Sequence, residues 1–174
     1  MLRSKKLHSL EDLLIHQLKD IYYAEKQIHK GLGKLIKAAT NEQLRDALTN
    51  HREETAEHIT RLEQAFSELG LAAKSVKCPA IEGIIKETNE LVEESGESTI
   101  MDAAIISSAQ RVEHYEIAAY GCIRSFAEQL GYQKIVKLVQ STLDEEGAAD
   151  HLLSQIAEST VNPSAVESHE ESAV

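Results

Sequence analysis

Apolar side chains recur at every third or fourth position along most of the chain, which is the spacing of one face of an α-helix. Four long segments carry this pattern, over residues 9–39, 42–69, 99–130 and 132–159, and a shorter one covers 79–94. Ser9 stands at the start of the first segment as an expected N-cap residue. The composition also favours a chain that is nearly all helix, with two Pro, two Phe and no Trp.

The lengths of the connections indicate how these helices are joined. Only Thr40 and Asn41 separate the first two long segments, and Gly131 separates the last two, so each pair is expected to form an antiparallel hairpin. The connection over 71–98 is long enough to return along the bundle, and it includes the short helix. The sequence therefore predicts an all-α fold, a four-helix bundle with one long crossover that carries an extra short helix.

The two ends of the chain are expected to differ. We expect the helical domain to span residues 1–159 and the Ser- and Glu-rich residues 160–174, which include Pro163, to form a disordered acidic tail. No continuous apolar run follows the basic N-terminus, because Glu11 and Asp12 interrupt it. We therefore expect neither a signal peptide nor a membrane span.

Charged and histidine side chains interrupt the apolar face near the middle of each long helix. Glu25, for example, stands in the first helix where the spacing calls for an apolar residue. A lone buried carboxylate costs several kcal/mol or becomes neutral. Several carboxylates at one level of a bundle therefore need a compensating positive charge, which a pair of divalent cations would supply.

The candidate metal ligands are the interrupting residues that offer a carboxylate or an imidazole: Glu25, His51, Glu54, Glu113, Glu116, Glu146 and Asp150. Spacings of three or four residues, as between Glu113 and Glu116, keep both side chains on one helix face. His51 and Asp150 are each open between a direct ligand and a partner that orients a ligand. For His51, a satisfied core histidine is the third possibility.

Two further histidines and two arginines define the alternative. His58 and His114 are expected to be structural rather than metal ligands. Arg52 and Arg111 lie close enough in sequence to the carboxylates to neutralise them in a buried ion-pair network without any metal. We favour the metal, because no Lys or Arg occupies a position on the apolar face at this level.

Charge and cysteine content exclude some classes of function. The net charge of −11 argues against nucleic-acid binding, which needs a basic face. Cys78 and Cys122 lie far apart and form no Cys-x-x-Cys motif. This usage fits a reduced, cytoplasmic setting better than a disulfide framework.

Several short segments together resemble one known family. They are 21–27 (IYYAEKQ), 51–55 (HREET), 78–83 (CPAIEG), 112–118 (VEHYEIA) and 129–132 (QLGY). They resemble the YciE/YciF family of bacterial ferritin-like proteins, which are associated with stress responses, and the resemblance covers about residues 7–157. It implies a ferritin-like bundle, a dinuclear iron or manganese site and a homodimer.

The ligand pattern differs from the usual ferritin-like one, which takes one Glu from each of two helices and Glu-x-x-His from each of the other two. Here the second helix has His51-x-x-Glu54, in the reverse order, and the third has Glu113-x-x-Glu116. A site so rich in oxygen ligands favours iron or manganese over zinc.

Three hypotheses about function remain open. The favoured one is a ferritin-like metal-binding stress-response protein with two divalent ions, iron or manganese, in the bundle core. The second is a redox enzyme that uses the same ions for ferroxidase, peroxidase or catalase-like turnover of dioxygen or peroxide. The third is a metal-free helical protein with a structural or interaction role.

Overall fold

The computed structural model describes residues 6–96 and 98–172, and over these residues every regular element is a helix. The elements are α1 (Leu10–Ala38), α2 (Glu42–Glu68), α3 (Pro79–Glu94), α4 (Ser98–Gln129), α5 (Gln133–Ile156), the π-helix η1 (Ala157–Val161) and α6 (Asn162–Ser172). The prediction of an all-α chain is therefore confirmed. None of the helices in the described residues has a stretch long and apolar enough to cross a membrane.

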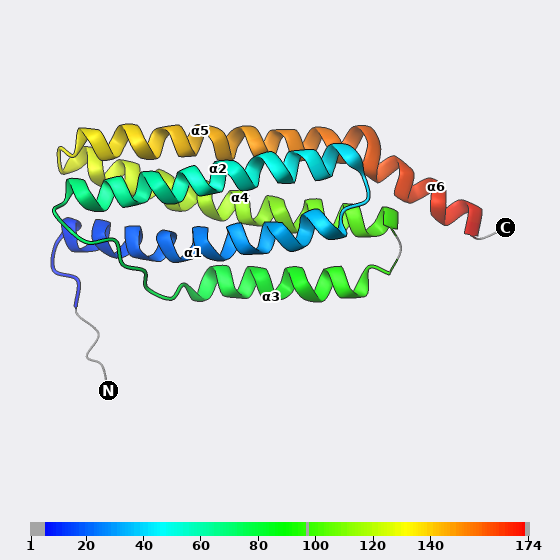
Figure 1. Ribbon diagram of the computed structural model, residues 1–174, viewed down its shortest axis with the longest axis horizontal. Coiled ribbons are helices and arrows are strands. Elements are labelled where there is room, and N and C mark those ends of the chain that lie inside the picture. The colour runs from blue at the N-terminus through cyan, green and yellow to red at the C-terminus, as the bar shows by residue number, and fades with distance from the viewer. Residues whose placement is uncertain (1–5, 97, 173–174) are drawn as a thin grey trace.

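Four of the helices form an antiparallel bundle (Figure 1). Helix α1 packs against α2 and α4, and α5 packs against the same two helices, so α1 and α5 lie diagonally across the bundle. After α2 the chain runs back along the bundle through α3, which covers α1 and α4, before α4 begins at the opposite end (Figure 1). This is the ferritin-like bundle with one long crossover and an extra short helix, as predicted.

Local sequence signals set the ends of the helices. The Ser9 side chain accepts a hydrogen bond from the Asp12 amide at 3.0 Å, and Asn41 caps α2 in the same way through the Leu44 amide at 3.0 Å. Gly131 ends the α4–α5 turn at a φ of 81°, a conformation that residues with a Cβ rarely adopt. Tight turns hold each hairpin in register, so the middle residues of its two helices lie at one level.

Asp102 ties the first hairpin to the second. Its carboxylate is 4% exposed and accepts hydrogen bonds from the backbone amides of Thr40 and Asn41, at 2.8 and 2.9 Å, and from the Thr40 hydroxyl at 2.6 Å. Asp102 lies near the start of α4, whereas the other two residues form the α1–α2 turn. This contact fixes where α4 begins along α1 and α2.

The C-terminal segment differs from the expectation of a disordered tail over 160–174. The helix continues through η1 into α6, and Val161 is 3% exposed in the hydrophobic core. The wider turn of η1 comes just before Pro163, which has no backbone N–H to offer to the helix, and α6 bends away from α5 there (Figure 1). Residues 173–174 lie outside the described part of the chain.

Candidate metal centre

A layer of buried polar side chains crosses the middle of the bundle, with apolar core above and below it. Helix α1 contributes Glu25, α2 contributes His51 and His58, α4 contributes Glu113 and Glu116, and α5 contributes Glu146. Each of these residues is at most 6% exposed, and Glu25, His58 and Glu146 are fully buried. The predicted convergence of mid-helix carboxylates is therefore present in the fold.

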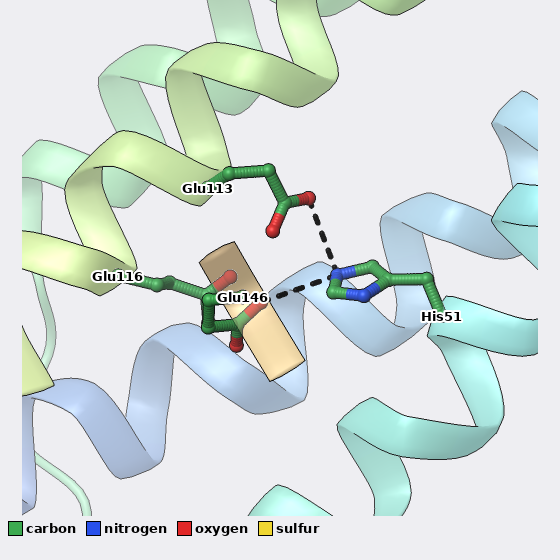
Figure 2. A group of neighbouring side chains, drawn as sticks. All are labelled: His51, Glu113, Glu116 and Glu146. Carbon is green, nitrogen blue, oxygen red and sulfur yellow. Dashed lines mark ion pairs between the residues drawn. The ribbon is translucent and has the colours of Figure 1, made fainter. Parts of the chain in front are cut away.

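The first group in this layer consists of His51, Glu113, Glu116 and Glu146, whose potential ligand atoms all lie within 4.8 Å of one another (Figure 2). Nε2 of His51 lies 3.3 Å from Oε1 of Glu113 and 3.8 Å from Oε2 of Glu146. One imidazole nitrogen and three carboxylates therefore face a common point.

The second group consists of Glu25, His58 and Glu146, with ligand atoms again within 4.8 Å of one another. Nδ1 of His58 lies 3.5 Å from Oε1 of Glu25 and 3.1 Å from Oε1 of Glu146. Glu146 belongs to both groups and presents one carboxylate oxygen to each histidine. It is the one residue that the two groups share.

Most of the polar atoms in this layer lack a hydrogen-bond partner within the described chain. They are Oε2 of Glu25, both ring nitrogens of His51, Nδ1 of His58, Oε2 of Glu113 and both carboxylate oxygens of Glu116 and Glu146. Leaving a buried polar atom unpaired costs about 1–3 kcal/mol, and more when the atom is charged. So many unpaired acceptors at one place match the needs of cations with oxygen and nitrogen ligands.

The alternative of a buried ion-pair network lacks its cations. Among the described residues, no Lys or Arg forms an ion pair with any of the four buried glutamates. Arg52 donates to the backbone oxygen of His29, and Arg111 pairs with Glu87 on the surface. The donor set therefore fits a pair of divalent cations better than an arginine network.

The electrostatics of the metal-free layer show the same deficit of positive charge. Burial raises the pKa of Glu25, Glu113 and Glu116, and the charge of Glu146 raises the last two further. Burial also disfavours the charged form of Glu146, but the imidazoles of His58 and His51 outweigh it and hold the Glu146 pKa below its usual value. Without metal, the layer is therefore strained by repulsion among carboxylates.

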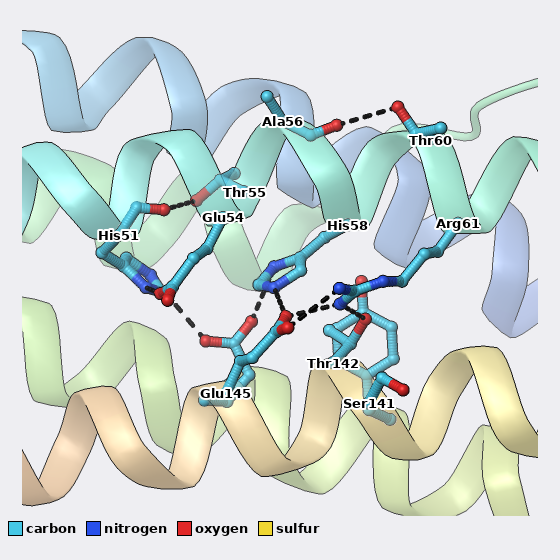
Figure 3. A network of polar contacts seen from close by, with 12 residues as sticks. His51, Glu54, Thr55, Ala56, His58, Thr60, Arg61, Ser141, Thr142 and Glu145 are labelled. Carbon is cyan, nitrogen blue, oxygen red and sulfur yellow. Dashed lines mark hydrogen bonds and ion pairs between the residues drawn. The ribbon is translucent and has the colours of Figure 1, made fainter.

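His58 is held in place by a carboxylate outside the layer. Its Nε2 lies 2.9 Å from Oε2 of Glu145, and the guanidinium of Arg61 hydrogen-bonds both oxygens of the same carboxylate (Figure 3). Arg61 keeps the pKa of Glu145 below its usual range, so Glu145 is ionised and can only accept a hydrogen bond. His58 therefore carries a proton on Nε2 and directs Nδ1 towards Glu25 and Glu146.

Without metal, the ring of His58 is protonated and positively charged at neutral pH. Burial disfavours its protonated form, but the carboxylates of Glu146 and Glu25 outweigh this and raise its pKa to about 10. A carboxylate behind a metal-facing imidazole is the arrangement that orients histidine ligands in metal sites.

The structure brings together five of the seven residues predicted as ligands: Glu25, His51, Glu113, Glu116 and Glu146. Glu54 and Asp150 are not in either group. The Glu54 side chain is 46% exposed, with Oε2 3.6 Å from Nδ1 of His51. Asp150 accepts a hydrogen bond from Gln110 at 3.2 Å and faces His114 at 3.4 Å. Both residues lie beside the layer rather than in it.

His58 lies in the buried layer among possible ligands, contrary to the expectation of a purely structural role. The spacing along α2 indicates this position, because seven residues make almost two helical turns and bring His58 within about 20° of the direction of His51. Glu54 is three residues after His51 and points about 60° to one side. Tyr120 is also fully buried beside the layer and donates a hydrogen bond to Oε1 of Glu25.

The combined set of two histidines and four glutamates equals the usual ferritin-like inventory, but its distribution over the helices differs. Both histidines come from α2 and none from α5, while α4 supplies two glutamates. Because His51 and His58 lie two turns apart on one helix, each reaches a different group. One helix thus supplies the nitrogen ligand of both groups.

Comparisons with known proteins agree with this architecture. The chain is 47% identical over 160 residues to Protein YciF of Escherichia coli (strain K12), covering 91% of this chain and 96% of that protein. The crystal structure of the E. coli stress protein YciF matches with a TM-score of 0.85 at 46% identity, over 90% of this chain and 99% of that one.

Two further solved structures have the same fold. YcfI of Rhodopseudomonas palustris, whose description suggests a structural role, matches with a TM-score of 0.87 at 49% identity, over 88% of this chain and 98% of that one. A protein from Xanthomonas campestris pv. campestris matches with a TM-score of 0.72 at 18% identity, over 95% of this chain and 99% of that one, which shows the fold alone.

The family resemblance expected from the short sequence segments is thereby confirmed over most of the chain. Residues 9–166 match the model of a single family, described as a domain of unknown function (DUF892). These residues contain the whole of the buried polar layer, from Glu25 to Glu146, together with Glu145 and Arg61. The chain belongs to the DUF892 family.

Proposed function

We propose that this chain is a ferritin-like metal-binding protein that holds two divalent ions, iron or manganese, in the polar layer of its bundle. The observation that carries the proposal is the set of buried, unpartnered carboxylate and imidazole atoms around Glu146. Neutral neighbours stabilise such a buried group little, whereas a cation stabilises it strongly. No lysine or arginine of the described chain supplies that charge.

The ligands divide into two sets that share one residue. His51, Glu113 and Glu116 would hold one ion, Glu25 and His58 would hold the other, and Glu146 would bridge them. With four carboxylates and two imidazoles, the set suits iron or manganese better than zinc, which prefers sulfur and nitrogen in closed sites. A role in a stress response is carried over from the similar E. coli protein YciF, which is described as a stress protein.

A titration of the chelator-treated protein with Mn²⁺ or, without oxygen, with Fe²⁺ tests the proposal. We expect two ions per chain by calorimetry and by metal analysis, and anomalous scattering at the metal edge beside Glu146. Glu146→Ala should lose both ions, whereas the exposed Glu53→Gln on α2 should bind like the parent. Parent protein that binds no Fe²⁺ or Mn²⁺ at micromolar concentrations would contradict the proposal.

Turnover of a small oxidant is the second candidate, and one observation favours it. A cavity of about 170 Å³ is lined by both exposed residues and the buried His51 and Glu113, so dioxygen or peroxide has a path to the layer. Ions held there would supply electrons to the oxidant. Oxygen uptake after Fe²⁺ loading, compared between parent and Glu116→Gln, tests this candidate.

The homodimer implied by the family resemblance stays a prediction.

A further inference from the structure

The buried ligands need a route by which a hydrated cation reaches them, and the structure contains two openings towards the layer. The first lies between α2 and α5 and is the cavity of about 170 Å³ lined by His51, Glu54, Glu113 and Glu145. The second lies between α1, α3 and α4, has a volume of about 50 Å³, and also reaches Glu113. Glu113 is thus approached from two sides.

The two openings differ in the charge at their walls. The smaller one is lined mainly by apolar side chains such as Ile28, Leu32 and Ile85, and its one lysine, Lys34, repels a cation. The larger one is lined by Glu54, Glu113 and Glu145 and, within the described part of the chain, by no lysine or arginine. Because a desolvated cation is costly in apolar surroundings, only the larger opening suits it.

His51 lines this opening and also belongs to the ligand layer, and Figure 3 shows its ring beside Glu54. Its ring is 6% exposed, and neither nitrogen has a hydrogen-bond partner. Nε2 faces the buried Glu113 at 3.3 Å, whereas Nδ1 faces Oε2 of Glu54 at 3.6 Å. One ring therefore connects the half-exposed carboxylate of Glu54 with the buried carboxylate of Glu113.

Glu54 has the properties of a first docking point. Its side chain is 46% exposed, so a cation bound there keeps much of its water. Exposed Leu152 and Ala148 of α5 line the same cavity and leave the approach open from the surface. A carboxylate at the mouth of a cleft raises the local concentration of cations and their rate of binding.

We infer that Glu54 is the loading carboxylate of this protein, which captures divalent cations at the mouth between α2 and α5 and passes them across His51 to Glu113. This inference rests on the proposed function and assigns Glu54 a kinetic role instead of the ligand role predicted from its spacing. Glu54 then acts on the rate at which the ion arrives at the buried ligands.

Stopped-flow mixing of the chelator-treated protein with Mn²⁺ tests the inference. Binding is followed by quenching of tyrosine emission, since the chain has five Tyr and no Trp, and the Tyr120 hydroxyl contacts Glu25 in the layer. We expect Glu54→Gln to slow association about tenfold at low salt, from the loss of one charge close to a divalent ion. Glu54→Lys should slow association further, and the effect of either change should shrink as salt is added.

The matched control is Glu53→Gln, an exposed glutamate one position away on α2 that lines neither opening. It should associate at the parent rate and bind Mn²⁺ with the affinity of the parent. Unchanged association in Glu54→Gln would overturn the inference, as would equal slowing in both variants. Parent protein that binds neither Mn²⁺ nor Fe²⁺ would instead refute the proposed function itself.

Discussion

Nε2 of His58 lies 2.9 Å from Oε2 of Glu145, while Nδ1 of the same ring faces the buried carboxylates of Glu25 and Glu146. The ring is therefore fixed from outside the layer and offers its other nitrogen inside it. Arg61 completes the arrangement by holding Glu145 with two hydrogen bonds (Figure 3). Neither Glu145 nor Arg61 belongs to a ligand group, yet both decide the orientation of one ligand.

Glu145→Leu tests this orienting role. Loss of the acceptor frees His58 to rotate, so we expect affinity for Mn²⁺ to fall about 10–100-fold, the usual effect of removing a carboxylate behind a histidine ligand. Glu145→Gln keeps an acceptor oxygen for Nε2, so its affinity for Mn²⁺ should fall less. Chelator competition measures both. Asp144→Leu, at the exposed neighbouring position of α5, is the control, and an equal loss there would contradict the role of Glu145.

Glu116→Gln separates a metal ligand from a structural ion pair. Both carboxylate oxygens of Glu116 are buried without a partner, so removing the charge should leave the chelator-treated protein at least as stable as the parent. The same variant should lose most of the rise in melting temperature that Mn²⁺ gives to the parent, because binding to the folded state is what stabilises it.

Thermal melts with and without chelator decide the outcome for Glu116→Gln. The exposed Glu128→Gln on α4 is the matched control and should keep the full metal-dependent rise. If Glu116 instead neutralised a buried cation of the protein, its loss would destabilise the metal-free chain by about 3–5 kcal/mol. A loss of that size in Glu116→Gln would show that Glu116 is not a metal ligand.

The metal-free protein should become more stable as the pH falls from about 8 to about 5. Glu25, Glu113 and Glu116 have raised pKa values, so they bind more protons folded than unfolded, and their repulsion is relieved as they are neutralised. His58, with its pKa raised to about 10, acts in the same direction, and its contribution is complete below its ordinary value of 6.5.

The opposite trend begins only at lower pH. Glu145 and Glu146 have lowered pKa values, and the stability that they contribute is lost as the pH falls below their ordinary value of 4.5. Metal-free protein should therefore be most stable between about pH 4.5 and 6.5. Melts of the chelator-treated chain measure this, and Glu116→Gln should flatten the rise. A stability that drops steadily from pH 8 to pH 5 would contradict the expected charge deficit.

Asp102→Ala should weaken the fold without changing the ligands. The substitution removes the carboxylate that accepts part-buried hydrogen bonds from the backbone amides of Thr40 and Asn41, which we expect to cost about 1–3 kcal/mol of unfolding free energy. Urea unfolding of the chelator-treated protein measures the cost. Because Asp102 lies far along α4 from Glu113, the number of Mn²⁺ ions bound per chain should stay the same. A change in that number would show that the position of the start of α4 also determines how the ligands are arranged in the polar layer.

Much of the fold was predictable because helix signals are local. The three-and-four spacing of apolar residues, the cap at Ser9, the turn at Thr40 and Asn41 and the glycine at 131 all act within a few residues, and they placed the helices and the crossover close to their observed bounds. Glu25, Glu113, Glu116 and Glu146 were recognisable for the same reason, as charges on faces that otherwise had to be buried.

The helical structure of the C-terminal segment could not be predicted from its own sequence. Residues 160–174 have the composition of a disordered segment, and nothing in their own pattern shows that Val161 finds a place in the core against α4. That contact depends on the position of a helix about 60 residues away in sequence, and so only the packed bundle decides it.

The amino-acid sequence by itself therefore determined which residues are helical, which face of each helix is buried and which charges interrupt that face, because these depend on spacing along one helix. Only the tertiary structure decided how each side chain is used. Glu54 and His58 both lie near His51 on α2, but the neighbouring α5 leaves Glu54 at an open cavity and encloses His58 between Glu145 and Glu146. The difference is one of contacts between helices, and a helix alone does not contain it.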